Sequence, residues 1–175
     1  MSALLLVQMH GEPGSGKTTL ARSLAGRLPA IHLDKDVLMS ALLKARLPRE
    51  VAGPASYEVL WDLAASLLGE GHSVIVDSPA YWPIIEARGR GAARGARARY
   101  AMIETRCDPA EVERRLANRE RLVSNPRERQ DWLAMPGTRE PSRERLVLDS
   151  ARPVEALVEE ALAYLQGARV PEGAA

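Results

Sequence analysis

The strongest chemical signal in the sequence is a glycine-rich run near the N-terminus. It reads Gly-Glu-Pro-Gly-Ser-Gly-Lys-Thr and fits the pattern G-x-x-x-x-G-K-[ST] in full. Glycines let the backbone approach a polyphosphate closely, so that its N–H groups converge on phosphate oxygens at the start of a helix. The lysine of such a loop contacts the β- and γ-phosphates, and the threonine hydroxyl binds Mg²⁺. We therefore predict that ATP and Mg²⁺ bind at Gly11, Glu12, Pro13, Gly14, Ser15, Gly16, Lys17, Thr18 and Thr19.

Carboxylates follow several of the short apolar runs in the chain. Asp34 and Asp36 follow one such run, and Asp77 and Asp149 end two others. In an open parallel sheet, ligands gather beyond the carboxyl ends of the strands. Phosphoryl transfer to an alcohol benefits from a carboxylate that accepts the hydroxyl proton, and Asp36 is the candidate for that base. Asp34 could bind the acceptor or a Mg²⁺-bound water, although either residue could instead cap the next helix.

The segment around Asp77 is expected to lie on the acceptor side of the nucleotide. Asp77 could belong to the surroundings of Mg²⁺, line the acceptor pocket, or simply begin a turn at the following Ser-Pro pair. Tyr81 and Trp82 follow closely and are candidates for the pocket wall, with core packing as the alternative for Trp82.

Two arginines, Arg115 and Arg119, stand four residues apart in an expected helix and so share one helical face. Guanidinium groups at the hinge of a lid can neutralise charge on a phosphoryl group in transfer. The alternative is a solvated helix in which Glu111 pairs with Arg115. A second basic stretch, 88–99, has no aromatic residues to stack on bases and indicates a solvated helix face.

Alternating short strands and helices are expected to position these residues. Apolar runs predict strands, and apolar residues three or four positions apart predict helices. This alternation predicts a mostly parallel sheet with helices on both faces. The expected strands are 4–9, 30–34, 72–77, 99–106 and 146–149, and the expected helices are 17–28, 37–47, 57–68, 83–96, 109–119 and 153–165, with a loop over 48–54 and Ser56 as a helix cap.

Composition places the chain among globular proteins of a single domain. We assign residues 1–167 to that domain, with a lid over about 120–145, and 168–175 to a flexible tail. The net charge of +1 gives no strong field for nucleic acid or membrane. Cys107 is the sole cysteine, and the apolar N-terminal run is too short to span a bilayer. A cytoplasmic protein is expected.

Taken in order, these motifs resemble small P-loop kinases related to chloramphenicol phosphotransferase, shikimate and gluconate kinases, and the kinase domain of polynucleotide kinase. The resemblance implies a five-stranded sheet in the order 2-3-1-4-5, a lid after the fifth helix, and ATP-dependent phosphorylation. It also implies Asp36 as the base and Arg115 and Arg119 as lid arginines, with Arg119 touching the nucleotide. The turn that contains Arg152 and Pro153 would pack near the adenine.

One departure from the group bears on the acceptor. Polynucleotide kinases carry an arginine three residues after the catalytic aspartate, where this chain has Met39. An apolar residue there favours a less charged small-molecule acceptor, such as an antibiotic or other metabolite. Two alternatives remain: a polynucleotide 5′-hydroxyl kinase, which would require the 88–99 arginines to line the acceptor cleft, and an ATP-binding switch, which would require that cleft to be closed.

Overall fold

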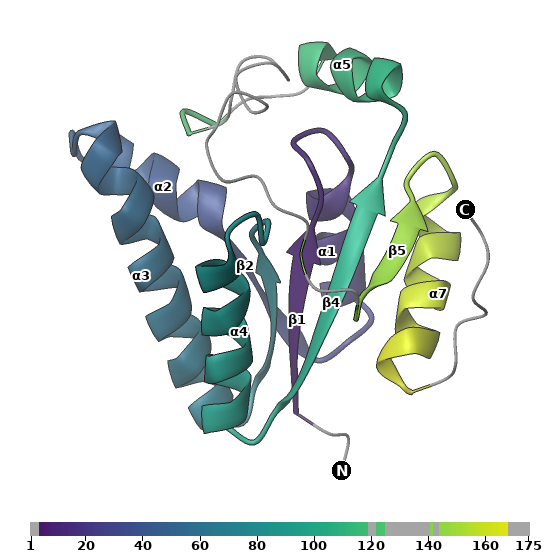
Figure 1. The fold of residues 1–175 in the computed structure, drawn as a ribbon, viewed down its shortest axis with the longest axis horizontal. Helices are drawn as coiled ribbons and strands as arrows, with labels where there is room; N and C mark the ends of the chain where they lie inside the picture. Colours follow the sequence, from purple (N-terminus) through teal and green to yellow (C-terminus); the bar gives the residue numbers. More distant parts are fainter. Residues whose placement is uncertain (1–3, 119–121, 125–140, 142–143, 168–175) are drawn as a thin grey trace.

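A five-stranded parallel sheet forms the centre of the protein (Figure 1). The computed structural model describes residues 4–118, 122–124, 141 and 144–167. The strand order is β2-β3-β1-β4-β5, which confirms the order that the family resemblance implied. The strands are β1 (Leu5–His10), β2 (Ala30–Asp34), β3 (Ser73–Asp77), β4 (Arg99–Arg106) and β5 (Leu146–Asp149).

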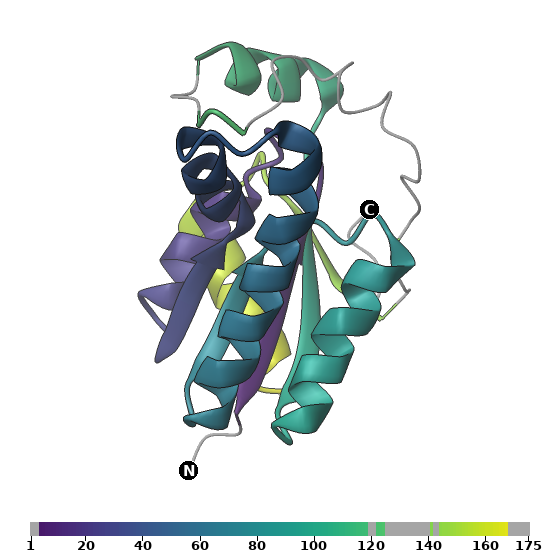
Figure 2. The ribbon, with the colours of Figure 1, turned by 90° about the vertical axis from the view of Figure 1, so that its left-hand side faces the viewer.

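Helices cover both faces of the sheet, as the alternating pattern predicted. On one face α1 (Lys17–Ala25) packs beside α7 (Val154–Leu165), and on the other α3 (Arg49–Gly69) lies beside α4 (Pro83–Gly95) (Figure 2). The short helix α2 (Lys35–Lys44) packs against α3. Helix α5 (Pro109–Asn118) lies above the carboxyl ends of the strands (Figure 1).

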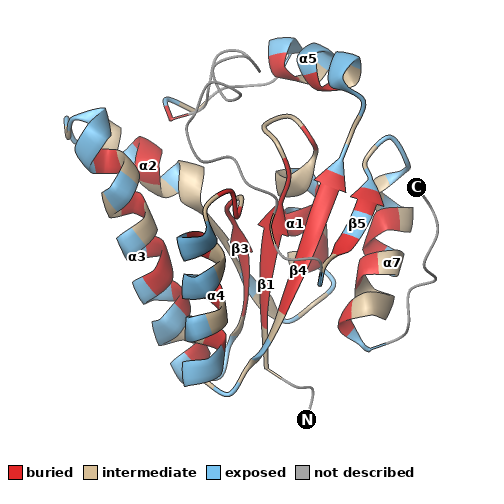
Figure 3. Ribbon diagram, in the orientation of Figure 1, coloured by how far each residue is buried: buried red, intermediate tan, exposed pale blue. Residues whose placement is uncertain are grey.

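Two apolar layers hold the sheet between its helices, and the central strand β1 contributes to both. Val7 and Met9 belong to the layer under α1 and α7, whereas Leu6 belongs to the layer under α3 and α4. All three side chains are buried, which is why this strand appears in the sequence as a near-continuous apolar run. Figure 3 shows the burial concentrated on the strands and on the inner faces of the helices.

The start of α3 corrects the sequence prediction. Residues 48–54 were expected to form a loop, but α3 begins at Arg49 and includes Pro54. The first turn is closed by hydrogen bonds from the N–H groups of residues 51 and 52 to the Pro48 carbonyl. Ala52 is fully buried, so packing outweighs the helical hydrogen bond that Pro54 cannot make. Ser56 is not a helix cap, because its hydroxyl donates to the Gly53 carbonyl within α3.

Other boundaries differ by smaller amounts. Helix α2 begins at Lys35, two residues earlier than expected, because the Asp34 side chain caps it. Helix α1 ends at Ala25, directly before Gly26, and not at residue 28 as predicted. The predicted lid over about 120–145 and the tail over 168–175 lie largely or wholly outside the described residues. Among the helices that the structure describes, none combines the length and the apolar character needed to cross a bilayer.

Candidate functional site

The glycine-rich loop joins β1 to α1 at the centre of the carboxyl edge of the sheet (Figure 1). Its first residue, Gly11, has a φ of 132°, which side chains rarely tolerate. A Cβ atom built there would lie 2.5 Å from the Thr105 carbonyl oxygen. Gly16 caps α1 with a φ of 91° and a left-handed backbone. Strand, loop and helix therefore follow one another in the arrangement that a P-loop requires.

Side chains from β4, from the segment after β3 and from the start of α1 contact this loop. The Ser15 hydroxyl lies 2.8 Å from the Thr105 hydroxyl on β4. The Tyr81 hydroxyl donates to the Gly11 carbonyl from the other side, so the segment after β3 is tied to the loop. Lys17 Nζ lies 3.4 Å from the Glu12 carbonyl oxygen, to which it donates. The lysine side chain therefore bends back over the loop, toward the side that would hold phosphate.

A buried histidine supports the same loop from β1. His10 Nδ1 accepts a hydrogen bond of 3.1 Å from the Ala80 N–H, and its ring meets the Tyr81 ring edge-on. Burial lowers the pKa of His10 from 6.5 to about 4, with Glu104 opposing and the cations Arg145 and Lys17 adding to the effect. His10 is therefore neutral near pH 7, and its role is to connect β1 with the segment after β3.

Asp34 and Asp77 occupy equivalent positions at the ends of neighbouring strands, where they are register partners. Asp77 is buried, and neither of its carboxylate oxygens makes a hydrogen bond to a described group, although His32 Nε2 lies 3.5 Å from Oδ2. Burial alone would raise the pKa of Asp77, but the nearby His32 and Lys17 offset it and hold that pKa low. Asp77 is thus a buried anion beside the first turn of α1.

This arrangement fits a Mg²⁺ ion bound mainly by phosphate and water. Within the described ranges, no three His, Cys, Asp or Glu side chains gather to form a metal site of their own. Mg²⁺ commonly keeps several waters and uses only one or two carboxylates together with substrate phosphates. The Thr18 hydroxyl and the orphaned Asp77 oxygens are the groups suited to hold it and its waters.

Asp34 and Asp36 have different partners. Asp34 Oδ1 accepts a hydrogen bond of 2.8 Å from the Asp36 N–H, so capping, an alternative left open by the sequence, holds for Asp34. Burial, and next the charge of Asp77, raise the pKa of Asp34. The Asp36 carboxylate lies 2.7 Å from Lys35 Nζ and remains about one-third exposed. Of the two carboxylates, Asp36 is therefore the better placed to meet a substrate.

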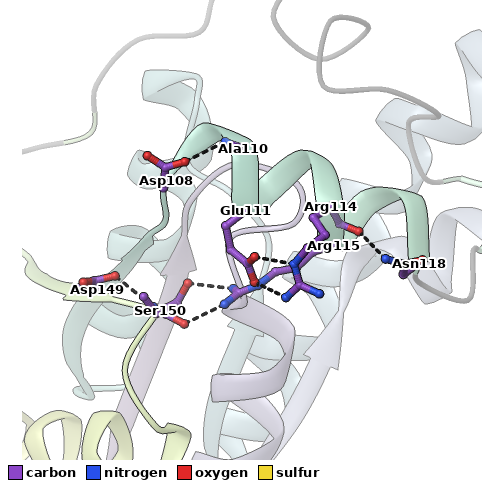
Figure 4. Close-up of polar contacts among 9 residues, drawn as sticks. Asp108, Ala110, Glu111, Arg114, Arg115, Asn118, Asp149 and Ser150 are labelled. Carbon is purple, nitrogen blue, oxygen red and sulfur yellow. Dashed lines mark hydrogen bonds and ion pairs between the residues drawn. The ribbon is translucent and has the colours of Figure 1, made fainter.

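Arg115 connects α5 to the turn after β5 (Figure 4). Its Nη1 and Nη2 donate to the hydroxyl and the carbonyl of Ser150, each at 2.9 Å, and its Nε donates to Glu111 at 2.7 Å. A Cβ atom on Gly16 would lie 3.4 Å from Arg115 Nη1, so the guanidinium borders the phosphate loop. Pairing with Glu111, which the sequence left open as the alternative to a site role, therefore occurs together with a position in the lining of the cavity. Arg119 lies outside the described residues.

One cavity of about 1080 Å³ joins these groups at the carboxyl edge of the sheet. One group of its lining residues comes from α1, α5, the turn after β5 and α7, and the other from α2, α3 and the segment after β3. We call the first group the nucleotide half of the cavity and the second the acceptor half; α2 and α3 lie on the opposite side of the P-loop from β5 and α7 (Figure 1). The predicted site residues that line it are Pro13, Gly14, Gly16, Lys17, Thr18, Thr19, Asp34, Asp36, Met39, Asp77, Tyr81, Trp82, Arg115 and Arg152; Gly11, Glu12, Ser15 and Pro153 do not line it.

Several lining residues were missed by the sequence prediction. Tyr57 comes from α3 and lies under Lys35 Nζ, which is 5.6 Å from the ring centroid. The Ser124 hydroxyl donates to the Asp36 carbonyl at 2.9 Å and accepts from Ser40 at 2.9 Å. Arg49 Nη2 donates to the Val123 carbonyl at 3.0 Å. No local pattern marks these residues, since each is brought to the site by tertiary packing.

The basic stretch 88–99 does not contribute to this cavity. Arg88 pairs with Glu58 at 2.6 Å, and Arg90 pairs with Glu86 at 2.8 Å. Arg99 donates to the Leu165 carbonyl at the opposite end of the sheet. None of the arginines in this stretch lines the cavity. A polynucleotide kinase would require these arginines to line the acceptor cleft, and they do not.

A parallel sheet in this order, with a glycine loop opening the first helix at its centre, defines a P-loop nucleotide-binding fold of the kinase type. The chain belongs to the AAA domain family, whose sequence profile matches residues 6–142. A search of curated proteins finds no match.

Solved structures confirm the fold at low sequence identity. A protein from Chloroflexus aurantiacus is similar with a TM-score of 0.75 and 21% identity, over 97% of this chain and 100% of that one. A sugar kinase from Janibacter sp. gives 0.71 and 22%, over 94% and 95%. The Mycobacterium tuberculosis APS kinase CysC, in complex with AMPPNP and APS, gives 0.70 and 22%, over 95% and 99%.

Proposed function

We propose that the protein transfers the γ-phosphoryl group of ATP, bound with Mg²⁺, to a hydroxyl group of a small molecule. The observation that carries this proposal is the single cavity lined by both Lys17 and Asp36. A nucleotide held by the P-loop would place its terminal phosphate near Lys17. The half of the cavity that contains Asp36 extends beyond that point and leaves space for a second substrate.

The reaction divides among a few side chains of this protein. The loop N–H groups and Lys17 bind the phosphates, while Thr18 and Asp77 are the residues that would hold Mg²⁺ and its waters. When bound, Mg²⁺ supplies positive charge that stabilises the phosphate oxygens during transfer. Asp36 orients the acceptor hydroxyl and takes its proton as the hydroxyl oxygen bonds to the γ-phosphorus. The bond from that phosphorus to the β–γ bridging oxygen breaks, and ADP leaves.

Arg115 is better suited to positioning than to a mobile arginine finger. Three hydrogen bonds to Glu111 and Ser150 fix its guanidinium at the border of the loop. The faces of that fixed guanidinium plane, together with Arg152, which lines the same cavity, would hold the nucleotide on the α7 side of the P-loop. A role for Arg119 as the lid arginine that meets the transferred phosphoryl remains part of this proposal.

The similar structures support a kinase more than the two alternatives. A sugar kinase and an APS kinase share the fold over nearly the whole chain, and the APS kinase was solved with AMPPNP and APS together. A polynucleotide kinase is disfavoured because the 88–99 arginines lie away from the cavity. A switch protein without an acceptor is disfavoured because the cavity beside Asp36 and Asp77 is open and is also lined by Tyr57 and Trp82.

Transfer of label from γ-labelled ATP tests this function directly. Alcohols, aminoglycosides, nucleosides and 5′-hydroxyl oligonucleotides would be offered to the purified protein with Mg²⁺. We expect a labelled product from a small-molecule alcohol and none from the Lys17→Ala variant. The Lys44→Ala variant, which alters an exposed lysine on α2, is the matched control and should retain the activity. Hydrolysis of ATP with no labelled acceptor anywhere in the panel would contradict the proposal.

A further inference from the structure

The acceptor half of the cavity has an apolar and aromatic wall. Met39 and Val37 contribute from α2, Tyr57 from α3, and Tyr81 and Trp82 from the segment after β3. Met39 and Tyr81 are buried, whereas Val37 is 48% exposed at the rim. A wall of this composition gains most from covering an apolar or aromatic surface.

The largely buried cation on this wall, Lys35, already has a carboxylate partner. Lys35 Nζ lies 2.7 Å from the Asp36 carboxylate and 5.6 Å from the centre of the Tyr57 ring, and its side chain is only 14% exposed. Burial alone would lower the pKa of Lys35, but Asp36 and Tyr57 more than offset this and raise it. An anionic acceptor would have to compete with Asp36 for this ammonium group, which would also disturb the proposed base.

The second cation on this side has a structural partner. Arg49 donates from Nη1 to the Ser124 carbonyl at 3.4 Å and from Nη2 to the Val123 carbonyl at 3.0 Å. These contacts fasten α3 to the segment that hydrogen-bonds with Asp36. Arg49 is exposed, so it lies at the rim rather than beneath a bound acceptor. The described part of this wall therefore offers no buried cation that lacks a carboxylate partner.

The carboxylates on this side of the cavity also have defined contacts. Asp34 caps α2, Asp36 pairs with Lys35, and Asp77 faces the P-loop beside His32. We infer that, given the proposed kinase activity, the acceptor is an uncharged alcohol with an aromatic or otherwise apolar body. Its hydroxyl meets Asp36 while its body lies against Tyr57, Trp82 and Met39. Burial of an unpaired charge against such a wall would carry a large cost, which is the basis of the selectivity.

A matched set of primary alcohols tests this inference. Benzyl alcohol, 4-(hydroxymethyl)benzoate and 4-(aminomethyl)benzyl alcohol share one body and differ in charge, and glucose supplies an uncharged polar comparison. We expect kcat/KM for phosphorylation to be at least about tenfold higher for benzyl alcohol than for any of the other three. A preference for the carboxylate would assign Arg49 as an anion receptor, and a preference for the amine or for glucose would likewise overturn the inference.

A charge added to the rim gives a gain-of-function test. Val37 is exposed and lines the cavity, so Val37→Arg should fold normally and place a cation beside the acceptor. We expect this variant to shift selectivity toward 4-(hydroxymethyl)benzoate by about tenfold. Val51→Arg adds the same charge to an exposed position of α3 that does not line the cavity, and it should leave selectivity unchanged. Equal selectivity in Val37→Arg and the unmodified protein would overturn the inference.

Calorimetry separates this inference from the proposed activity. The same four compounds can be titrated into the protein saturated with AMPPNP and Mg²⁺, which reports binding without transfer. Tightest binding of benzyl alcohol, with no phosphorylation of any compound from ATP, would support the pocket assignment and contradict the kinase proposal. Tighter binding of a charged compound, or of glucose, would contradict the pocket assignment whether or not transfer occurs.

Discussion

Arg115 and Ser150 are joined by two hydrogen bonds, from one guanidinium group to both the hydroxyl and the carbonyl of the same residue. Together with the contact to Glu111, they fix a side chain of α5 against the turn after β5 (Figure 4). This cross-connection borders the phosphate loop at Gly16. The nucleotide half of the cavity therefore has one wall that is braced from two distant parts of the chain.

Removal of this brace should weaken nucleotide binding. We expect Arg115→Ala to raise the KM for ATP by about tenfold or more, because charge-assisted hydrogen bonds that shape the site are lost. Arg27→Ala is the control, since Arg27 also forms an ion pair, with Glu159, but is exposed and does not line the cavity. Its KM for ATP should stay within about twofold. Equal KM values for ATP in the two variants would mean that Arg115 does not shape the nucleotide site.

Asp36 is expected to act in the chemical step rather than in nucleotide binding. Asp36→Asn keeps the size of the side chain but cannot accept the proton, so kcat should fall by about 10²- to 10⁴-fold. The dissociation constant for ATP, measured by calorimetry, should change by less than about twofold. Asp62→Asn on the exposed face of α3 should leave both quantities unaltered. Parallel losses in kcat and ATP affinity for Asp36→Asn would reject the base assignment.

Ser124 is expected to position Asp36 through the backbone. Its hydroxyl donates to the Asp36 carbonyl and accepts from Ser40, and the two serines are buried. We expect Ser124→Ala to lower kcat by about tenfold at a temperature where the variant remains folded, and to cost about 1–2 kcal/mol of stability. Ser66→Ala, at an exposed position of α3, is the comparison. A stability loss with an unchanged kcat would show that the contact is structural only.

Gly11 has both a positive φ and a close contact with the Thr105 carbonyl, and the effects of the two can be tested separately. Gly11→Ala should reduce affinity for a fluorescent ADP analogue by more than about tenfold, because the new Cβ atom would collide with the Thr105 carbonyl and displace the loop. Gly71→Ala is the matched control, since Gly71 also has a positive φ, of 88°, but a Cβ there would meet no atom within 4 Å. That variant should lose about 1 kcal/mol of stability and bind nucleotide normally. Normal nucleotide affinity in Gly11→Ala would contradict the steric argument.

His10 should make stability depend on pH. Its pKa is 6.5 in the unfolded chain and about 4 in the folded protein. As pH falls, the unfolded chain therefore takes up the proton first. The contribution of neutral His10 is complete above about pH 6.5 and is lost as pH falls toward 4. Between about pH 7 and pH 5 we expect a loss of about 2 kcal/mol in the free energy of unfolding.

His10→Asn isolates this contribution from that of the carboxylates. Asparagine can accept the hydrogen bond from the Ala80 N–H but does not titrate. Denaturant unfolding at both pH values should therefore show a smaller loss for the variant, by about 2 kcal/mol. The same pH dependence in both proteins would mean that His10 is accessible to protons in the folded state.

The parts of this fold that follow from sequence are those encoded locally. Buried strands such as Ser73–Asp77 appear as apolar runs, and the P-loop carries its own conformation in its glycines. The start of α3 was missed because Pro54 disfavours helix locally, while the burial of Ala52 that compensates for it depends on the folded structure.

The site likewise combines residues with a local sequence signal and residues placed only by tertiary packing. Lys17, Asp36 and Asp77, which were predicted as site residues, line one cavity. Lys17 was predicted from the P-loop motif, and the two aspartates from their positions after apolar runs. Whether Asp34 caps a helix or faces a ligand could not be decided beforehand, because a cap and a ligand group need the same short acidic side chain. Tyr57 and Ser124 reach the site only through the packing of α3 and of the segment after α5.

The hydrogen bond from Tyr81 to the Gly11 carbonyl joins the wall of one half of the cavity to the loop that serves the other. Under the proposed function, a ligand that shifts Tyr81 would also shift the backbone proposed to bind phosphate, so binding of either substrate should change the affinity for the other. Thermodynamic reciprocity then requires that each alters the affinity of the other by the same factor. The order in which they arrive would change the route to the ternary complex but not its free energy.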